Sequence, residues 1–297
     1  MIIDTHVHTS FSDGRTSVAD TVSIASDQGV KILAITDHDT IGAYPAAYEE
    51  AACRGMKLIA GVELSTRDED GYRDVHVVGL KMDLDNRALL NALEVLAKSR
   101  IDARRKLLDN INEYMASRFD TWVPAQFEDV LRRTLGTVVK PHLAAEVFSC
   151  AQKQGLAITE AEINRILRLP SVDVKNEGNL PMGECISLIH ESGGVAVLAH
   201  PCEYGEQMEP VMKKFHGLGG EATEICKHRY KSMYCDADAP ISSKAGLTME
   251  RRLNEKTLSM ARKYQLKITA SSDFHGKPVE PGIEIEDYGI DIEWLLD

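Results

Sequence analysis

Seven short runs of apolar or β-branched residues recur along this chain, and most of them are separated by stretches with helical spacing. Strands that alternate with helices in this way are typical of βα units around a parallel sheet. The pattern therefore predicts an α/β fold, and 297 residues are enough to bury a full core. The seven runs are residues 1–7, 30–36, 57–62, 74–81, 195–199, 221–226 and 267–271.

Two connections between these runs have signals of their own. Residues 17–28 predict a helix that Thr16 or Ser17 caps and that ends at Gly29. The third and fourth runs are joined by RDEDGY at residues 67–72, whose Asp-Gly pair is a turn signal. We therefore expect a hairpin-like link at this point in place of a crossover helix.

The pattern changes after the fourth run, because residues 85–180 contain no further strand run. Helical spacing there predicts a small all-helical domain, inserted into a sheet domain of residues 1–84 and 181–297. The insertion carries 14 Lys and Arg against 13 Asp and Glu, so it is the relatively basic part of a chain whose net charge is −12. Its KSRIDARRK run at residues 98–106 is interpreted as a solvated helix face. The expected helices are 86–118, 124–135, 141–153 and 159–169.

Residue types that bind metals gather near the ends of six of the seven runs. His6 and His8 project from the same face of the first run, because side chains alternate along a strand. One such pair alone would be interpreted as surface histidines. Functional groups of parallel α/β proteins collect at the carboxyl ends of the strands, so the repetition favours a metal site over coincidence. The candidate ligands are His6, His8, Asp13, His38, Glu63, His76, His200, Asp273 and His275.

This set of candidates indicates the kind and number of ions. Histidine and carboxylate ligands without cysteine suit Mn, Fe, Zn or Co, and nine candidates are too many for one ion. A carboxylate such as Glu63 can bridge two ions, and a metal pair about 3.5–4 Å apart can hold a hydroxide that attacks phosphorus in line. The residues therefore predict two or three divalent ions and hydrolytic chemistry.

Five motifs, DTHVHTSFSDG, AITDHDT, GVELS, VAVLAHP and SDFHG, occur in this order. They resemble the motifs of the PHP (polymerase and histidinol phosphatase) family over about residues 1–81 and 180–276. The resemblance implies a distorted (β/α)7 barrel, similar to a TIM barrel, with a trinuclear metal centre that the helical insertion covers. It also implies three ligand sets, which are His6, His8, Glu63 and Asp273; then Glu63, His76 and His200; and then Asp13, His38 and His275.

The helical insertion narrows the resemblance to stand-alone phosphoesterases of this family. These relatives remove the 3′-phosphate of nucleoside 3′,5′-bisphosphates or trim short 5′-phosphorylated RNA, and they bind phosphate through basic groups. The resemblance points to Lys140, Lys175 and Arg229, and His228 is a further candidate because it adjoins Arg229.

We therefore expect a metal-dependent phosphomonoesterase whose catalytic residues are Glu63, His200 and Asp273. The expected partner is a small phosphorylated nucleotide or a short RNA end. Two alternatives remain open. The same metals could serve another small substrate, such as histidinol phosphate or an amide, or the chain could be a non-catalytic metal-binding module.

Several carboxylates adjoin the candidate ligands without belonging to them. Asp4, Asp37 and Asp39 are interpreted as acceptors that orient ligand histidines, although Asp39 is equally suited to capping the helix that follows. Glu224, at the end of the sixth run, is assigned a structural hydrogen bond.

Composition bounds the location and the partners of the chain. No apolar stretch approaches the roughly 20 residues needed to cross a membrane, and no signal peptide is recognisable, so a cytoplasmic location without a membrane partner is expected. A net charge of −12 argues against a long nucleic-acid track, but it is compatible with small anionic ligands at a local basic patch. No feature indicates the oligomeric state.

Overall fold

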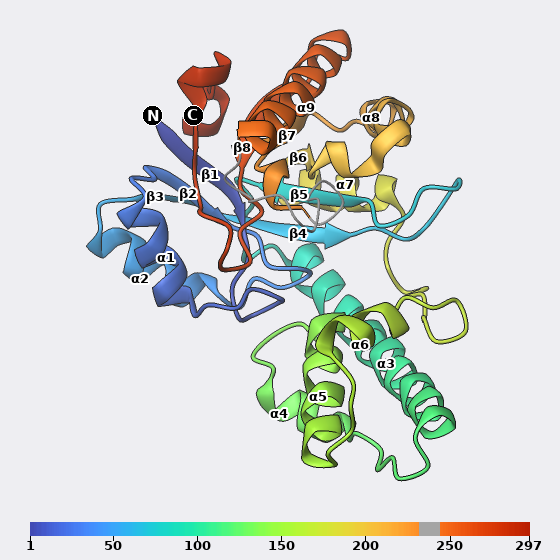
Figure 1. The fold of residues 1–297 in the computed structure, drawn as a ribbon. Coiled ribbons are helices and arrows are strands. Elements are labelled where there is room, and N and C mark those ends of the chain that lie inside the picture. The colour runs from blue at the N-terminus through green and yellow to red at the C-terminus, as the bar shows by residue number, and fades with distance from the viewer. Residues whose placement is uncertain (232–243) are drawn as a thin grey trace.

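The structure is a computed structural model that describes residues 1–231 and 244–297. Its strands form one sheet of four strands, in the order β3-β2-β1-β9, and one of five, in the order β4-β5-β6-β7-β8 (Figure 1). All seven predicted runs form strands, and the third run is divided into two. The strands are β1 (Ile2–Val7), β2 (Ile32–Ile35), β3 (Lys57–Ile59), β4 (Gly61–Ser65), β5 (His76–Leu80), β6 (Val195–Leu198), β7 (Ala222–Cys226), β8 (Lys267–Ser271) and β9 (Ile283–Glu284).

The directions of the strands differ between the two sheets. In the first sheet β1, β2 and β3 are parallel, and β9 pairs antiparallel with β1. In the second sheet β6, β7 and β8 are parallel, whereas β5 runs antiparallel to both β4 and β6. The link between β4 and β5 is the expected hairpin, closed by a bridge between Glu69 and Tyr72. The antiparallel direction of β5 follows from this hairpin, because a short turn can join only antiparallel strands, so the sheet is not parallel throughout.

The expected barrel does not form one closed sheet, because the third run passes from the first sheet to the second. The hydroxyl of Tyr44 lies at this passage, 2.7 and 2.8 Å from the carbonyl oxygens of Ile35 and Ile59, and it accepts a hydrogen bond of 2.6 Å from the N–H of Gly61. Isolated bridges, Val7 with Phe274 and His38 with Glu63, connect the two sheets. The strand ends that carry the candidate ligands are therefore brought to one rim.

Helices flank both sheets, α1 and α2 beside the first and α7, α8 and α9 beside the second (Figure 1). Ser17 caps α1 as predicted, since its side chain accepts a hydrogen bond from the N–H of Asp20. Among the described helices, none is both long and apolar enough to cross a membrane. The helices are α1 (Val18–Asp27), α2 (Tyr44–Cys53), α3 (Arg87–Arg118), α4 (Phe127–Arg133), α5 (Lys140–Lys153), α6 (Glu160–Ile166), α7 (Met182–Glu191), α8 (Met208–Gly217), α9 (Lys244–Lys263) and α10 (Glu293–Leu296), with 3₁₀ segments at Pro201–Gln207, His228–Tyr230 and Ile285–Tyr288.

Helices α3 to α6 occupy the range of the predicted insertion, and no strand lies between residues 85 and 180. In Figure 1 the distal part of α3 stands with α4, α5 and α6 to one side of the sheets. These helices share a hydrophobic cluster whose buried members all come from residues 107–172. The helical segment therefore has a core of its own.

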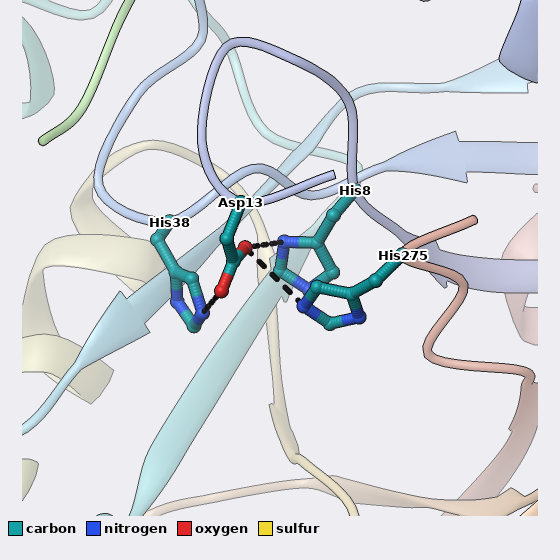
Figure 2. Close-up of side chains that lie close together, drawn as sticks. All are labelled: His8, Asp13, His38 and His275. Atoms are coloured by element: carbon teal, nitrogen blue, oxygen red, sulfur yellow. Dashed lines mark ion pairs between the residues drawn. The ribbon is translucent and has the colours of Figure 1, made fainter. Parts of the chain in front are cut away.

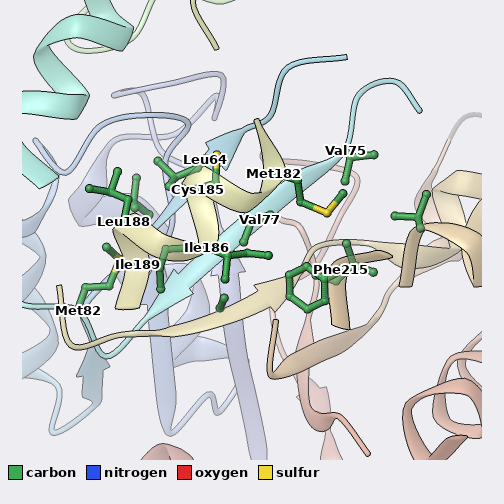
Figure 3. Close-up of a cluster of buried hydrophobic side chains, with 14 of the residues drawn as sticks. Leu64, Val75, Val77, Met82, Met182, Cys185, Ile186, Leu188, Ile189 and Phe215 are labelled. Atoms are coloured by element: carbon green, nitrogen blue, oxygen red, sulfur yellow. The ribbon is translucent and has the colours of Figure 1, made fainter. Parts of the chain in front are cut away.

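Helix α3 belongs to two cores. Leu89, Leu93 and Leu96, near its start, pack with α7, α8 and the second sheet, in the cluster that Figure 3 shows in part. Leu107 and Leu108 pack in the cluster of α4 to α6. Each buried leucine stabilises the fold by roughly 1.5–3 kcal/mol. One uninterrupted helix of 32 residues therefore joins the two units.

Candidate metal centre

Six histidines and three carboxylates converge at the rim where the two sheets meet. Four follow directly from strand positions: β1 contains His6 and is followed by His8, β4 contains Glu63, and β5 begins with His76. Because β5 is antiparallel to β4, its first residue lies at the same rim as the ends of the parallel strands. The other five follow strand ends: Asp13 and His38 after β1 and β2, His200 after β6, and Asp273 and His275 after β8.

The carboxylate of Glu63 lies between five imidazoles. Its Oε1 is 2.9 Å from Nδ1 of His76 and 3.2 Å from Nε2 of His200. Its Oε2 lies 2.9 Å from Nδ1 of His38, 3.2 Å from Nε2 of His8 and 3.3 Å from Nε2 of His6. Because the two oxygens face different groups of imidazoles, Glu63 has the arrangement of a ligand that bridges two ions.

A second carboxylate, that of Asp13, gathers three imidazoles on the more open side of the centre (Figure 2). Its Oδ1 is 3.2 Å from Nε2 of His275 and 3.4 Å from Nδ1 of His8, and its Oδ2 is 3.6 Å from Nε2 of His38. The side chain of Glu63 is 1% exposed, whereas that of His275 is 34% exposed. The side of the centre that carries His275 is therefore more open to solvent than the side of Glu63.

The donor set fits divalent ions. Ligand atoms lie within 4.8 Å of one another in three groups, namely His8, Asp13, His38 and His275; His6, His8 and Asp273; and His38, Glu63 and His76. Buried Asp13 Oδ1, His38 Nδ1 and Glu63 Oε2 have the ion-pair contacts given above, but within the described part of the chain none of them has a hydrogen bond of good geometry. Buried polar atoms normally have partners, so these atoms point to ligands from outside the chain. The assignment of each residue to an ion stays a prediction.

The charges of the cluster depend on one another. Burial disfavours a charge on Glu63, but the imidazoles of His38, His6 and His76 hold the pKa of this carboxyl well below its usual range. Burial likewise disfavours a charge on His38, but Glu63 and Asp13 raise its pKa to about 10. Since a metal-ligating imidazole must be neutral, divalent ions displace protons when they bind here.

Neighbouring groups hold the outer ring nitrogens of His6 and His8. Nδ1 of His6 lies 3.0 Å from Oε1 of Glu224, which also accepts a hydrogen bond of 2.7 Å from the N–H of His200. Nδ1 of His8 lies 3.2 Å from Oγ of Ser12, whose hydroxyl donates to Asp37. Both acceptors require a proton on Nδ1, and Nε2 is left with a lone pair for a metal.

Three aspartates were expected to orient ligand histidines. Asp4 and Asp39 have other partners than a histidine ring, and Asp37 acts on a ring only indirectly. Asp4 accepts hydrogen bonds from Ser272 and Gly282 and joins the start of β1 to the segment after β8. Asp39 accepts from the N–H of Ser65 and forms an ion pair with Arg100. Asp37 acts through Ser12, which itself accepts from Nδ1 of His8, and Glu224 is the carboxylate that accepts from Nδ1 of His6.

Substitution of Glu224 is expected to weaken metal binding. In the Glu224→Ala variant His6 loses the acceptor that fixes its tautomer, and we expect Mn²⁺ affinity to fall about 10–100-fold, the usual effect of removing such a partner. In Glu224→Gln the amide oxygen can still accept both hydrogen bonds, so the loss should be smaller. Titration with Mn²⁺ measures both variants. Equal affinities for Glu224→Ala and the unmodified chain would contradict this role.

Two arginines near the centre were not identified from the sequence. Arg100 donates a 3.2 Å hydrogen bond to Oγ of Ser65, beside its ion pair with Asp39, and Arg104 follows one turn later. Arg104 is 8% exposed, and its Nε has no hydrogen-bond partner among the described residues. The interpretation of residues 98–106 as a solvated face is wrong for these two. Leu96, Arg100, Arg104 and Leu107 follow one another at intervals of three or four residues, so the two arginines lie on the buried stripe of α3. This helical spacing could have identified them as buried.

Three of the four predicted substrate-binding residues form ion pairs with carboxylates, and the fourth is buried. Lys140 Nζ is 2.7 Å from Asp173, and Lys175 Nζ is 3.1 Å from Asp68. Arg229 NH1 is 2.5 Å from Glu250 of α9, and His228 is fully buried. The cation of this loop that reaches a candidate ligand is Lys231, which pairs with Asp273 and which sequence reasoning missed.

The segment before α5 touches the loop that carries Asp13. The N–H of Thr137 donates a 2.7 Å hydrogen bond to the carbonyl oxygen of Phe11. A Cβ on Gly136 would lie 2.2 Å from the same oxygen, so only glycine fits there. The first turn of α5, which begins with Lys140, is therefore held close to the open side of the centre.

The fold and this centre define an α/β protein with a histidine- and carboxylate-rich metal-binding site at its strand ends. The chain belongs to the PHP domain family, whose model matches residues 4–170. Over 285 residues it is 31% identical to the 5′-3′ exoribonuclease Rnm of Salmonella typhimurium, which covers 93% of this chain and 85% of that protein. Over 228 residues it is 25% identical to a 3′,5′-nucleoside bisphosphate phosphatase of Chromobacterium violaceum, covering 75% of this chain and 76% of that protein.

The fold is shared with a solved structure. An amidohydrolase from Chromobacterium violaceum superposes with a TM-score of 0.71 at 22% identity, covering 95% of this chain and 91% of that chain. The superposition includes nearly the whole chain, so the helical segment and the sheets occur together in that protein as well.

Proposed function

We propose that this chain removes the 3′-phosphate of a nucleoside 3′,5′-bisphosphate or hydrolyses the end of a short 5′-phosphorylated RNA. The chain is a metal-dependent phosphoesterase, in keeping with its family and with the relatives named above. The narrower choice of substrate is supported by their names, which specify RNA and a nucleoside bisphosphate. The acidic charge of −12 favours a short substrate over a long one.

The observation that carries this proposal is the position of Glu63. Its Oε1 faces His76 and His200, and its Oε2 faces the histidines of β1 and His38. Hydrolysis of a phosphate ester by a metal pair needs two ions close together, and a buried carboxylate between two groups of imidazoles provides that spacing. We therefore assign Glu63, His200 and Asp273 as the catalytic residues.

In the proposed mechanism the protein holds the ions and positions the phosphoryl group. The nine ligands would bind two or three ions of Mn, Fe or Zn in the sets implied by the family resemblance. When bound, these ions neutralise charge on the phosphoryl oxygens and activate water as the nucleophile. His6 and His8 would hold ions through Nε2, because Glu224 and Ser12 keep the proton of each ring on Nδ1.

The helical segment supplies cations for a second phosphate. Arg100 and Arg104 are buried side by side, and burial together with Arg104 lowers the pKa of Arg100 to about 9. Arg100 is already paired with Asp39, whereas Nε of Arg104 has no hydrogen-bond partner among the described residues. Arg104 is therefore the cation suited to a phosphate, with which arginine forms paired hydrogen bonds. Lys140 at the start of α5 is a further contact. This arrangement suits a substrate with one phosphate at the ions and another at α3.

The remaining features of the proposal concern the whole chain. We propose that the two sheets are the halves of the distorted barrel, formed by residues 1–84 and 181–297, and that residues 85–180 are an insertion that covers the site. Contacts of Arg100 and Thr137 with the rim support this cover. A cytoplasmic location is part of the same proposal.

Replacing Lys140 with alanine is expected to raise KM about tenfold with kcat within about twofold. A lysine that contacts only a substrate phosphate contributes equally in the ground and transition states, and one charged hydrogen bond is worth about 1.5 kcal/mol. Steady-state kinetics checks this result. Lys153→Ala, at the other end of α5, is the matched control. An unchanged KM for Lys140→Ala would remove this residue from the substrate site.

Product release by the Mn-loaded protein tests the proposed function. Inorganic phosphate is measured with adenosine 3′,5′-bisphosphate, 5′-AMP and histidinol phosphate, and mononucleotide is measured with a 5′-phosphorylated oligoribonucleotide, because hydrolysis of its terminal phosphodiester bond releases a nucleotide and not phosphate. We expect phosphate release from the bisphosphate or nucleotide release from the oligonucleotide, with little phosphate release from 5′-AMP. Turnover of histidinol phosphate without nucleotide preference would favour the alternative hydrolase. No release from any substrate, despite bound metal, would contradict the proposal.

A further inference from the structure

Lys231 links two loops of the metal centre. Its Nζ lies 2.6 Å from Oε1 of Glu203 and also contacts Oδ2 of Asp273. Glu203 belongs to the 3₁₀ segment that follows His200, and Asp273 lies just after β8. The side chains of Lys231 and Asp273 are 20% and 6% exposed, so this ion pair is largely shielded from solvent.

The two oxygens of Asp273 have separate partners. Oδ1 lies 3.2 Å from Nε2 of His8 and 3.6 Å from Nε2 of His6, inside one of the three ligand groups. Oδ2 contacts Lys231. The carboxylate therefore presents one oxygen to the centre while the lysine holds the other.

The backbone at both ends of this link is strained. His200 has φ +28° and Asp273 has φ +52°, which are left-handed conformations that residues with side chains seldom adopt. Such conformations persist only where neighbouring contacts hold them. Glu203 Oε2 lies 3.7 Å from Nδ1 of His200, so the chain from Glu203 through Lys231 to Asp273 spans both strained ligands.

We propose that Lys231 is a positioning residue, which holds Asp273 as a ligand through Oδ1 alone and ties its loop to that of His200. This inference rests on the proposed function, because it concerns the same centre.

The role of Lys231 is tested by Mn²⁺ titration of the Lys231→Met variant without substrate. Methionine keeps most of the length and apolar volume but removes the charge, so Oδ2 of Asp273 is no longer held. We expect Mn²⁺ affinity to fall about tenfold, with an unchanged far-ultraviolet circular dichroism spectrum. Glu203→Gln should lower the affinity in the same direction but less, and Lys231→Arg should restore part of it.

The control is Lys263→Met, which breaks an exposed lysine–glutamate pair with Glu209 away from the centre and should leave Mn²⁺ affinity unchanged. Kinetics of the metal-saturated Lys231→Met variant provide a second measurement. A positioning role predicts a lower kcat with KM within about twofold. A raised KM with normal Mn²⁺ affinity would overturn the proposal, because Lys231 would then be a substrate contact. A raised Mn²⁺ affinity would also overturn it, because the lysine would then compete with the ion for Asp273.

Because metal affinity is measured without substrate, this experiment is independent of the proposed function. Inactivity of the unmodified chain on every phosphate ester, together with weaker Mn²⁺ binding by Lys231→Met, would contradict the proposed function and leave the role of Lys231 standing. Normal turnover by the unmodified chain, together with unchanged Mn²⁺ affinity in Lys231→Met, would support the proposed function and contradict the role of Lys231.

Discussion

Replacing Glu63 with alanine is expected to lower kcat/KM for phosphate release by at least about 10³-fold and to reduce the number of ions bound. Glu63 faces five imidazoles, so its loss removes a contact shared by two of the proposed ion sites. Bound ions stabilise the transition state by several kcal/mol, and each 1.4 kcal/mol is a factor of ten in rate. Metal analysis of the purified variant and steady-state kinetics measure the two effects, and His8→Ala should give the same result.

The matched control for Glu63 is Glu221→Ala. Glu221 also faces a histidine, with Oε2 3.1 Å from Nε2 of His190, but this pair lies on the surface. We expect its removal to leave metal content and turnover unchanged. A Glu63→Ala variant that kept both full metal content and full activity would contradict the bridging arrangement.

Replacing Arg100 with methionine is expected to lower the free energy of unfolding by about 3 kcal/mol. Its partner Asp39 is fully buried as a side chain, and removing one member of a buried ion pair leaves an uncompensated charge. The double variant Arg100→Met with Asp39→Asn should recover part of the loss, because it removes the second charge as well. Denaturant-induced unfolding of the metal-free protein measures all three proteins.

An exposed arginine on the same helix, paired with Glu128 of α4, provides the control for Arg100. Arg105 NH1 lies 2.9 Å from Glu128, and both side chains are largely exposed, so Arg105→Met should change stability little. If Arg100→Met and Arg105→Met had equal effects, the ion pair between Arg100 and Asp39 would not stabilise the fold as argued here.

The strands could be predicted from the sequence because each run is rich in apolar or β-branched residues. The arrangement of the strands could not be predicted. The third run is divided between the two sheets at a point held by the hydroxyl of Tyr44, which belongs to helix α2 and not to the run itself. The two-residue β9 is too short to leave a pattern. The direction of β5 did follow from the Asp-Gly turn before it.

The convergence of the nine candidate ligands could be predicted because the carboxyl ends of parallel strands in an α/β fold lie at the same rim. The hydrogen-bond acceptors that hold the outer ring nitrogens of these ligands could not be predicted. Glu224 is 218 positions away from His6 in the chain, and only the packing of β7 near β1 makes it the acceptor, whereas the nearby Asp4 is used elsewhere. Lys231 was missed because nothing local distinguishes it from Arg229, which faces α9.

Helix α3 runs without interruption through both cores. Leucines anchor the helix on each side of Arg100 and Arg104, so these guanidinium groups keep one height and one direction relative to the metal ligands. Inserting a single residue between Leu96 and Arg100 would shift them by about 1.5 Å and turn them by about 100°. If the proposed second phosphate site is correct, the length of α3 between its two leucine anchors sets the distance between phosphates that a substrate must have.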